Sequence, residues 1–320
     1  MIARSRSRAA GIAAGYLADR VFADPRRGHP VAGFGRLAAA AERISYRDSR
    51  TAGALHTTAL VGGAVIAGAL IQRGAGNVAP RIAVVCLGTW AALGGTTLAR
   101  TGTEMADLLA DGDIPGAREL LPSLCGRDPA SLDEAGLTRA TLESMAENTS
   151  DATVAPLLWA AMAGLPGVLG YRAVNTLDAM IGHRSARYNR FGWGAARLDD
   201  VANYPAARLA GLLTALCAPV VGGSASGALL AWRRDAARHP SPNAGVAEAA
   251  FAGALGVRLG GPTQYRHQLE IRPTLGDGRL PDVGDLRRAV RLSQAVQLAA
   301  VVVAAGITAA ARTGRRVSPR

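Results

Sequence analysis

The sequence contains no lysine, and all 36 of its basic residues are arginine. A phosphate-binding loop of the Walker A type needs a lysine side chain, and so does an enzyme that forms a Schiff base with its substrate. Both kinds of chemistry are therefore excluded. Arginine instead supplies a permanent positive charge and a planar guanidinium that binds phosphate or carboxylate through two parallel hydrogen bonds.

Cysteine and aromatic residues are also scarce. The three cysteines, Cys86, Cys125 and Cys217, are scattered and form neither a zinc-binding pattern nor a disulfide framework, which indicates a reducing compartment. Aromatic residues make up 4% of the chain, and no motif combines them with basic residues. The net charge of +12 therefore does not predict a nucleic-acid-binding protein, and no nucleic-acid partner is expected.

Apolar runs, by contrast, are long and numerous. Hydrophobic residues make up 49% of the chain and the mean hydropathy is +0.14, which is too apolar for an ordinary soluble enzyme. The candidate membrane spans are residues 52–71, 82–99, 154–170, 206–232 and 292–311. Proline and glycine interrupt the third and fourth runs, which favours broken or re-entrant passages there. The sequence predicts an all-α, multi-pass integral membrane protein with about four to five spans, forming a single membrane-embedded catalytic domain over residues 1–320.

The arginines concentrate in the polar segments between these runs. Residues 1–51 carry ten, 100–152 four, 172–204 five and 232–290 nine, whereas the short linker 72–81 carries two. By the positive-inside rule, the four large segments belong on the cytoplasmic side. Five simple spans would place the third segment outside, whereas broken passages would keep every polar motif in the cytoplasm. The number of true spans stays open.

Polar motifs crowd around the third apolar run. Two Asn-Thr-x-Asp tetrads, at 148–151 and 175–178, flank residues 154–170. An Asp-Asp pair follows at 199–200, and Asn203 comes one turn later. Polar residues beside a membrane-length apolar run are costly unless they serve a function. The pattern predicts an active site at the membrane surface, carried by polar helical segments.

Two further motifs carry charge. Glu143, Glu147 and Asp151 fall on one face of a helix predicted from Leu137 onward, where they repel each other by a few tenths of a kcal/mol per pair. A divalent cation or an arginine partner would offset this repulsion; the alternative is a solvated acidic face. The segment 24–30, with two prolines and a glycine, predicts a fixed turn that presents two arginines and a histidine.

These residue types suit metal-assisted phosphate chemistry. Mg²⁺ prefers oxygen ligands, often one or two protein carboxylates with substrate phosphates, and arginine neutralises phosphate charge. The candidate metal ligands are Glu147, Asp151, Asp178 and Asp199. The candidate catalytic residues are Asp178, Asp199, Asp200 and His29, although His29 could instead brace its turn. The candidate phosphate- and substrate-binding residues are Arg26, Arg27, Asn148, Arg172, Asn175, Arg184, Arg187, Tyr188, Asn203, Arg208, Ser241 and Asn243.

Three classes of protein fit this chemistry. The first is an ATP-dependent ligase at the membrane, and the second is a Mg²⁺-dependent membrane transferase of prenyl or phosphatidyl groups. The third is a transporter with an ion site made of carboxylates. The transferases usually carry Asp-x-x-x-Asp repeats in two spans, which this sequence lacks. A transporter would carry its charges within the spans, whereas these charges flank them.

Five stretches of the sequence match a known family. They are DPRRGHPV at 24–31, ENTSDATVAPL at 147–157, YRAVNTLDAMIG at 171–182, FGWGAARLDDVANYPAARL at 191–209 and SPNAGVAEAAFAGALGVRLGGPTQY at 241–265. With these motifs, in this order over most of its length, the chain resembles the adenosylcobinamide-phosphate synthases of cobalamin biosynthesis, the CobD/CbiB family.

The resemblance implies a multi-pass enzyme of the inner, cytoplasmic membrane. Such an enzyme uses ATP to join aminopropanol phosphate, or aminopropanol, to the free propionate of adenosylcobyric acid through an amide bond. It further implies that carboxylates hold Mg²⁺ on ATP, that arginines hold phosphates and that asparagines suit the carboxamides of the corrinoid. The expected partners are the corrinoid, the amino alcohol phosphate and membrane lipid. A complex with other membrane enzymes of late cobalamin synthesis, and a homo-oligomer, stay open.

Overall fold

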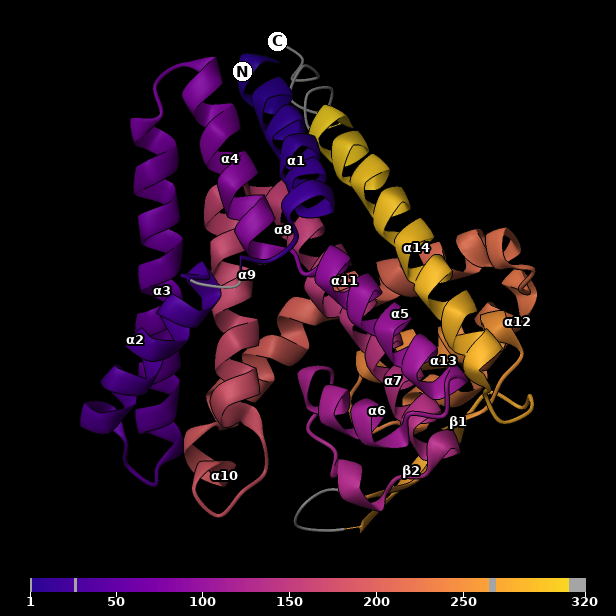
Figure 1. The fold of residues 1–320 in the computed structure, drawn as a ribbon. Coiled ribbons are helices and arrows are strands. Elements are labelled where there is room, and N and C mark those ends of the chain that lie inside the picture. Colours follow the sequence, from indigo (N-terminus) through magenta and orange to yellow (C-terminus); the bar gives the residue numbers. More distant parts are fainter. Residues whose placement is uncertain (1, 26–27, 265–268, 311–320) are drawn as a thin grey trace. The chain divides into compact units, whose positions relative to one another are not determined.

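The computed structural model describes residues 2–25, 28–264 and 269–310. Nearly all of the described chain is helical, and its strands form one two-stranded antiparallel sheet (Figure 1). Among the described residues, four helices are long and apolar enough to cross a membrane: Arg50–Gly74, Val78–Ala110, Trp193–Val221 and Val283–Ala310. The predicted class, an all-α protein with several membrane spans, is confirmed.

The chain forms two compact units, each built from separate stretches of sequence. Unit 1 comprises the described residues within 1–94, 155–203 and 300–320. Unit 2 comprises residues 95–154 and the described residues within 204–299. Two helices, α11 and α14, contribute residues to both units. Pro205 lies inside α11, close to the point where the chain passes from unit 1 to unit 2, and a proline there removes one backbone hydrogen bond of the helix.

Unit 1 is a set of helices that pack closely through small residues. Gly11 and Gly15 lie against Val85 and Thr89, and a Cβ at either glycine would collide with these side chains. Such contacts are typical of helices that associate in lipid, where small residues let backbones approach. The helices of unit 1 are α1 (Ile2–Phe22), α2 (Pro30–Ser45), α3 (Arg50–Gly74), α4 (Val78–Ala92), α8 (Ala155–Ala163), α9 (Leu165–Leu177), α10 (Tyr188–Phe191) and the first part of α11 (Trp193–Cys217).

The N-terminal segment extends along the α3–α4 hairpin instead of lying at one end of it. Gly11 on α1 meets Val85 near the start of α4, so α1 begins at the linker between α3 and α4. At the far end of α2, Ser45 Oγ lies 2.8 Å from Nδ1 of His56, near the start of α3. Residues 1–51 therefore contain two helices, α1 and α2, along this hairpin, and the cytoplasmic placement of the segment stays a prediction.

The third apolar run is divided into two helices. α8 ends at Ala163 and α9 begins at Leu165, with Gly164 between them at φ 71°. The Gln72 side chain caps the new helix, since its Oε1 accepts a hydrogen bond from Leu165 N at 2.8 Å. The fourth run is also interrupted, where α11 gives way to a 3₁₀ turn ending at Val221. Glycine and proline break both runs, as their positions in the sequence indicated.

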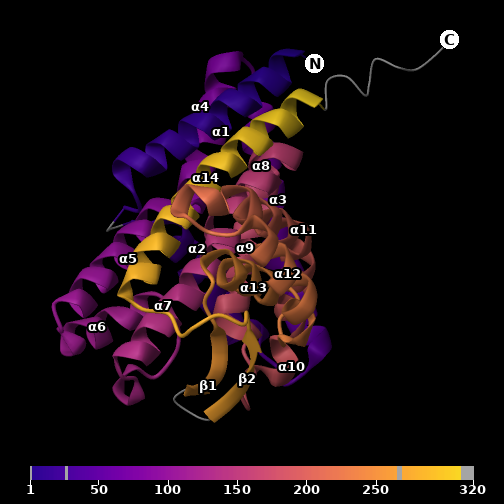
Figure 2. The ribbon, with the colours of Figure 1, turned by 90° about the vertical axis from the view of Figure 1, so that its right-hand side faces the viewer.

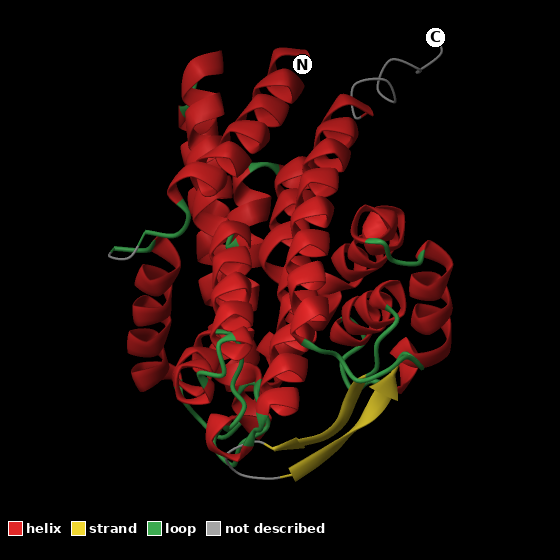
Figure 3. Cartoon of the chain, turned by 45° about the vertical axis from the view of Figure 1, so that its right-hand side comes forward, coloured by secondary structure: helices red, strands yellow, loops and turns green. Residues whose placement is uncertain are grey.

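Unit 2 surrounds a helix, α13, whose residues are almost all buried. The neighbours of α13 include α7, α12 and the two strands, which lie side by side next to it (Figures 2 and 3). The elements of unit 2 are α5 (Gly95–Ala110), α6 (Ile114–Leu120), α7 (Glu134–Thr149), α12 (Ala225–Asp235), α13 (Ala244–Leu255), β1 (Leu259–Gln264), β2 (Leu269–Leu275), the end of α11 and most of α14 (Val283–Ala310).

The strand pair carries an irregularity that serves the site described below. The register pairs Leu259 with Leu275 and Gly261 with Arg272, so Gly260 lies opposite two residues of β2, Pro273 and Thr274, in a bulge. Gly260 and Gly261 have φ values of 80° and 88°, which side-chain-bearing residues rarely adopt. The bulge points the Gly260 amide away from the ladder, where it donates to Glu143 Oε1 at 2.7 Å.

Candidate active site

Both Asn-Thr-x-Asp tetrads lie where an α-helix changes into a π-helical turn. α7 ends at Thr149 and the π-helical segment Ser150–Val154 follows; α9 ends at Leu177 and the π-helical segment Asp178–Gly182 follows. π-Helical turns are rare and occur mostly at functional sites. The aspartate of each tetrad lies in the first turn of its π-helical segment.

The two tetrads also share local hydrogen bonds. Each threonine hydroxyl donates to the carbonyl four residues earlier, Thr149 to Met145 at 2.6 Å and Thr176 to Arg172 at 2.7 Å. Each asparagine side chain is held by the preceding turn: Asn148 donates to the Ser144 carbonyl, and Asn175 accepts from Arg172. The tetrad in unit 2 and the tetrad in unit 1 are therefore the same local structure in different surroundings.

In unit 1, the second tetrad adjoins the first turns of α11. Asp199 Oδ2 accepts a hydrogen bond from Asn203 Nδ2 at 2.9 Å, and Asn203 Oδ1 accepts one from the buried Tyr171 hydroxyl at 2.8 Å. The Asp178 carboxylate lies close enough to Asp199 for electrostatic repulsion, and Asn175 lies at the same carboxylate. The structure thus brings together four of the polar residues that the sequence singled out.

The two carboxylates offer oxygen atoms of the kind that a cation binds. Asp199 Oδ1 is shielded from solvent and has no hydrogen-bond partner. At the other carboxylate, a Cβ on Gly182 would collide with Asp178 Oδ1, so glycine is needed for Asp178 to hold this position. Two repelling carboxylates with an unsatisfied buried oxygen fit Mg²⁺, which binds one or two protein carboxylates and keeps its other positions for water or phosphate. Within the described residues there is no group of three or more His, Cys, Asp or Glu side chains arranged to hold a metal ion.

The turn at 24–30 is braced by its histidine. His29 caps α2, since its Nδ1 accepts a hydrogen bond from Val31 N at 3.1 Å, and its Nε2 lies 3.3 Å from Asp24 Oδ1. Because Nδ1 is an acceptor, the ring proton sits on Nε2 and faces Asp24. Both ring nitrogens therefore have structural partners, and the catalytic role of His29 stays a prediction. Arg26 and Arg27 lie outside the described residues.

The arginines after the second tetrad lie at the start of α3. Arg187 donates to Glu42 Oε1 through Nε at 3.2 Å and Nη2 at 2.8 Å, and it stacks on the Tyr46 ring at 4.1 Å. The Tyr188 hydroxyl donates to the same Glu42 carboxylate at 3.1 Å. Arg184 is exposed. The hydrogen bonds that Arg187 donates to Glu42 raise the pKa of Arg187, and they hold α2 against the loop.

Asp200 points to a different neighbour from Asp199. Its Oδ2 lies 3.5 Å from Arg197 Nη1, one turn earlier on α11, in a largely exposed ion pair. The adjacent aspartates of the Asp-Asp pair are therefore not equivalent: one belongs to the hydrogen-bonded group with Asn203, and the other interacts with an exposed arginine.

In unit 2, the acidic face of α7 is buried and partnered by arginine. Glu143, 2% exposed, forms an ion pair with Arg127, which is 6% exposed, and accepts from the Gly260 amide. The sequence predicted two ways to offset repulsion along this face, a divalent cation or an arginine partner. The structure shows the arginine partner. Glu147, one turn later, is half-buried; desolvation raises its pKa, against the opposing charges of Arg272 and Arg127.

A third carboxylate, Glu248 of α13, faces the same cluster. It is 1% exposed, its Oε2 has no hydrogen-bond partner, and its Oε1 lies 3.8 Å from His239 Nε2 and 3.9 Å from Arg272 Nη1. Desolvation, followed by repulsion from Glu143 and Glu147, raises the pKa of Glu248 well above its usual range. Burial lowers the pKa of His239, so this ring is neutral. Unit 2 therefore buries three carboxylates beside two guanidinium groups.

The SPNAG motif lies beside α11 within unit 2. Arg208 Nη1 donates to Asn243 Oδ1 at 2.8 Å and stacks on the Tyr204 ring at 3.5 Å. Ser241 Oγ accepts from the backbone amides of Asn243 and Ala244, which starts α13. The structure thus brings together three predicted substrate-binding residues, and it gives each of them a contact within the protein.

Sequence reasoning missed much of the unit 2 cluster. Arg127, His239, Glu248 and Arg272 were not among the candidates. Glu248 could have been found, because it is the only charged residue in the apolar stretch 244–255, and a lone carboxylate in such a stretch needs a partner or a function. Arg272 reaches the cluster only through the strand pair, which periodicity did not predict.

The sequence matches a family model over most of its length. The model is that of the CobD/Cbib protein family, and it covers residues 12–293. The chain belongs to the CobD/CbiB family. All five motifs named above lie within this range.

Curated relatives in the CobD/CbiB family are similar over nearly their whole length. A Mycobacterium tuberculosis protein named "Cobalamin biosynthesis protein CobD" is 66% identical over 299 residues, covering 93% of this chain and 95% of the relative. Proteins of the same name from Geobacter metallireducens and Rhodobacter capsulatus are each 43% identical, covering 91% and 83% of this chain and 94% and 85% of the relatives. No solved structure matches the chain significantly.

Proposed function

We propose that this CobD/CbiB family member acts in cobalamin biosynthesis as an adenosylcobinamide-phosphate synthase. In this proposal it joins the free propionate of adenosylcobyric acid to (R)-1-amino-2-propanol O-2-phosphate, or to aminopropanol, in an ATP-dependent amide synthesis. The observation that carries the proposal is the family match over residues 12–293, which includes both tetrads with their π-helical turns. The names of the curated relatives agree with it.

The chemistry requires activation of a poor acyl donor. A propionate oxygen attacks the γ-phosphorus of ATP and ADP leaves, which gives an acyl phosphate. The amine nitrogen then attacks the acyl carbon, phosphate leaves, and the nitrogen loses a proton. Positioning and charge neutralisation do most of the work in such phosphoryl transfers. The protein must therefore hold phosphates, orient a carboxylate and an amine, and accept one proton.

In unit 1, we assign Asp178 and Asp199 to Mg²⁺. When bound there, Mg²⁺ would neutralise charge on the ATP phosphates. Tyr171 fixes Asn203, and Asn203 in turn fixes the Asp199 carboxylate, so the oxygen without a partner keeps a defined direction. Outer partners of this kind orient metal ligands and tune their affinity. Arg172 and Arg184 are the nearby guanidinium groups that we assign to phosphate.

In unit 2, we assign proton transfer to the buried carboxylates. The amine must be neutral to attack, so its proton needs an acceptor whose pKa lies nearer to neutrality than that of an ordinary glutamate. Glu147 has a raised pKa and is half-buried in unit 2. Glu147 was also a candidate metal ligand, and that assignment stays open beside this one. The next residue, Asn148, has a side-chain amide that can form hydrogen bonds with a carboxamide of the corrinoid.

We place the enzyme in the cytoplasmic membrane with these motifs at the cytoplasmic face, where ATP is available. The four helices long and apolar enough to cross a bilayer support the membrane location, and the basic polar segments support the orientation.

A direct assay tests the reaction. The protein, purified in mild detergent, is supplied with Mg-ATP, adenosylcobyric acid and aminopropanol phosphate, and the amide product is measured by mass spectrometry. We expect product only when ATP is present, and aminopropanol in place of its phosphate tests which amino alcohol is used. If folded protein binds corrinoid but makes no product, the reaction is wrong. If it binds no corrinoid either, a membrane transferase of prenyl or phosphatidyl groups becomes the better interpretation.

A further inference from the structure

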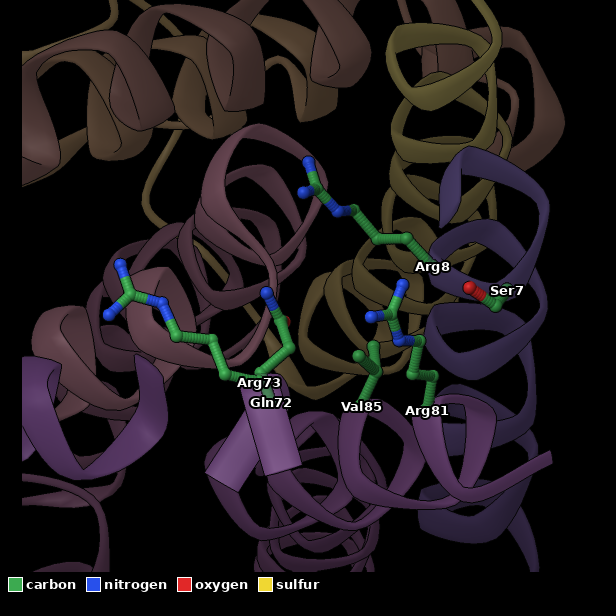
Figure 4. Close-up of a pocket in the computed structure, with 6 residues that line it drawn as sticks. All are labelled: Ser7, Arg8, Gln72, Arg73, Arg81 and Val85. Atoms are coloured by element: carbon green, nitrogen blue, oxygen red, sulfur yellow. The ribbon is translucent and has the colours of Figure 1, made fainter. Parts of the chain in front are cut away.

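A second site for an anion lies in unit 1, away from the tetrad. Three arginines, Arg8, Arg73 and Arg81, line a cavity of about 300 Å³ next to the linker between α3 and α4. In Figure 4 the side chains of Arg8 and Arg81 lie near each other, whereas the Arg73 side chain extends away from them on the other side of Gln72. Val85 is the remaining lining residue. The described part of the lining therefore contains three positive charges and no carboxylate.

Two of the arginines are fixed by backbone carbonyl groups. Arg8 Nη1 donates to the carbonyl oxygens of Ala161 and Met162, both at 3.1 Å, at the end of α8. Arg81 Nε donates to the Ala75 carbonyl at 2.7 Å, in the linker. These hydrogen bonds use one nitrogen of each guanidinium and orient the group. A guanidinium has five N–H donors, so most donors of each arginine stay available for a ligand.

Among the described residues, no carboxylate pairs with the positive charges of this cavity. Across the described ranges 2–25, 28–264 and 269–310, Arg8, Arg73 and Arg81 take part in no ion pair. Most other arginines near the described sites do have a carboxylate partner, as Arg127 and Arg187 show. Burial lowers the pKa of Arg8, which is the effect of a charge that is desolvated without compensation. The negative charge of a phosphate group would relieve this repulsion and match the fork geometry of the arginines.

The cavity lies at the opposite end of α3 from the tetrad-bearing loop. α3 has 25 residues, which at 1.5 Å per residue makes it about 37 Å long. Arg73 is in the last turn of α3 and Arg81 follows the linker, whereas Glu42, Arg187 and Tyr188 meet near its start. Because α3 and α4 belong to candidate spans, their shared end falls at the level of the lipid head groups, where arginine is favoured next to phosphate.

We propose that Arg8, Arg73 and Arg81 form a binding site for a phosphate group at the membrane face opposite the tetrad-bearing loop. The ligand is either the phosphodiester of an anionic phospholipid or a free phosphate. This site is additional to the phosphate sites that the amide synthesis needs, and it does not depend on that reaction being correct.

The test uses two charge-neutral variants and one matched control. The double variant Arg73→Gln/Arg81→Gln removes two charges and leaves the carbonyl contacts of Arg8 in place. The single variant Arg73→Gln alters only an exposed side chain, so it preserves the fold if the double variant does not. The control is Arg20→Gln, an exposed arginine at the other end of α1 that loses the same charge.

Binding is measured on delipidated full-length protein in neutral detergent. Native mass spectrometry counts bound phosphatidylglycerol against phosphatidylcholine, and calorimetry follows titration with inorganic phosphate. We expect wild type and Arg20→Gln to bind at least one anionic probe, the double variant to bind it about 10-fold or more weakly, and Arg73→Gln several-fold more weakly. Selective retention of phosphatidylglycerol without phosphate binding identifies a lipid ligand, whereas saturable phosphate binding that both Gln variants weaken identifies a free phosphate. Equal binding by wild type and both Gln variants, or no binding of either probe by wild type, overturns the proposal.

Discussion

The two Asn-Thr-x-Asp tetrads have the same backbone and opposite surroundings. In unit 1 the tetrad lies beside Asp199, which accepts a hydrogen bond from the neutral Asn203 amide, and Asn203 in turn accepts one from the Tyr171 hydroxyl. In unit 2 the tetrad follows a helix face on which Glu143 and Glu147 lie near Arg127 and Arg272. The described hydrogen-bond partner of Asp199 is neutral, whereas Glu143 in unit 2 forms an ion pair with Arg127.

This difference teaches that one local motif can serve two tasks. A carboxylate whose described hydrogen-bond partner is a neutral amide, as at Asp199, can attract a cation. A set of buried carboxylates that is short of positive charge instead retains a proton, because desolvation and mutual repulsion disfavour the last ionisation. The first arrangement suits metal binding and the second suits proton transfer.

The largest expected effect is the loss of charge at the unit 1 site. Asp199→Asn keeps the shape of the side chain and a hydrogen-bonding group for Asn203, but it removes one of two metal-binding charges. We expect amide formation to fall by about 100-fold or more, with an increase in the Mg²⁺ concentration needed for half-maximal rate. Asp200→Asn, its neighbour in the Arg197 ion pair, is the matched control and should keep most activity. Equal loss in both variants would show that Asp199 has no special role.

Next in size is the removal of a buried charge in unit 2. Glu143→Gln leaves the Arg127 guanidinium buried without its carboxylate, and breaking a buried pair in this way costs about 3–5 kcal/mol of stability. We expect a large drop in the thermal unfolding temperature of the detergent-purified protein. Asp107→Asn, which breaks the exposed pair with Arg287, should change it little. A stable Glu143→Gln protein would show that unit 2 does not need this ion pair.

A smaller effect with a definite pH dependence is expected at Glu248. Its pKa is raised in the folded protein, so the folded state holds a proton that the unfolded state releases above about pH 4.5. Stability from this group is therefore complete at low pH and is lost as the pH rises toward the folded pKa. Glu248→Gln imitates the protonated form, so the variant should lose less stability than wild type between pH 5 and pH 8. Unfolding temperatures measured across this range check the prediction; parallel pH curves would refute a protonated Glu248.

The smallest expected effect concerns the hydrogen bonds that position Asp199 in unit 1. Tyr171→Phe removes the hydroxyl that donates to Asn203 Oδ1, which leaves this buried oxygen without that partner. We expect a cost of about 1 kcal/mol in stability and a decrease in apparent Mg²⁺ affinity of about 10-fold. Tyr204→Phe, an exposed tyrosine on α11, is the control. A Tyr171→Phe variant with wild-type Mg²⁺ dependence would show that Asn203 does not need this support.

The sequence predicted the helical membrane fold and the interruptions of two apolar runs, because length, hydropathy and the positions of proline and glycine determine these features locally. The division into two units depends on which distant segments pack together, and composition does not encode that directly. The strand pair was missed for a related reason: its bulge at Gly260 is useful only because Glu143, far away in the sequence, accepts the amide hydrogen bond.

The site was predictable in its polar residues but not in their grouping. The crowding of Asp178, Asp199 and Asn203 beside apolar runs was visible in the sequence, and the structure brings these residues together. The π-helical turns were not visible, since the same residues would fit an ordinary helix end. Glu248 was overlooked because its helix is otherwise apolar, although that context is what raises its pKa.

The most direct test of the account compares the two tetrads in one assay. Asp178→Asn in unit 1 and Asp151→Asn in unit 2 make the same change at equivalent positions, and both variants are assayed for the ATP-dependent amide of adenosylcobyric acid. If both units serve this reaction, each variant loses product formation by at least about 10-fold, and only Asp178→Asn recovers part of its rate at high Mg²⁺. Wild-type rates of amide formation in both variants would contradict the claim that the tetrads carry the chemistry.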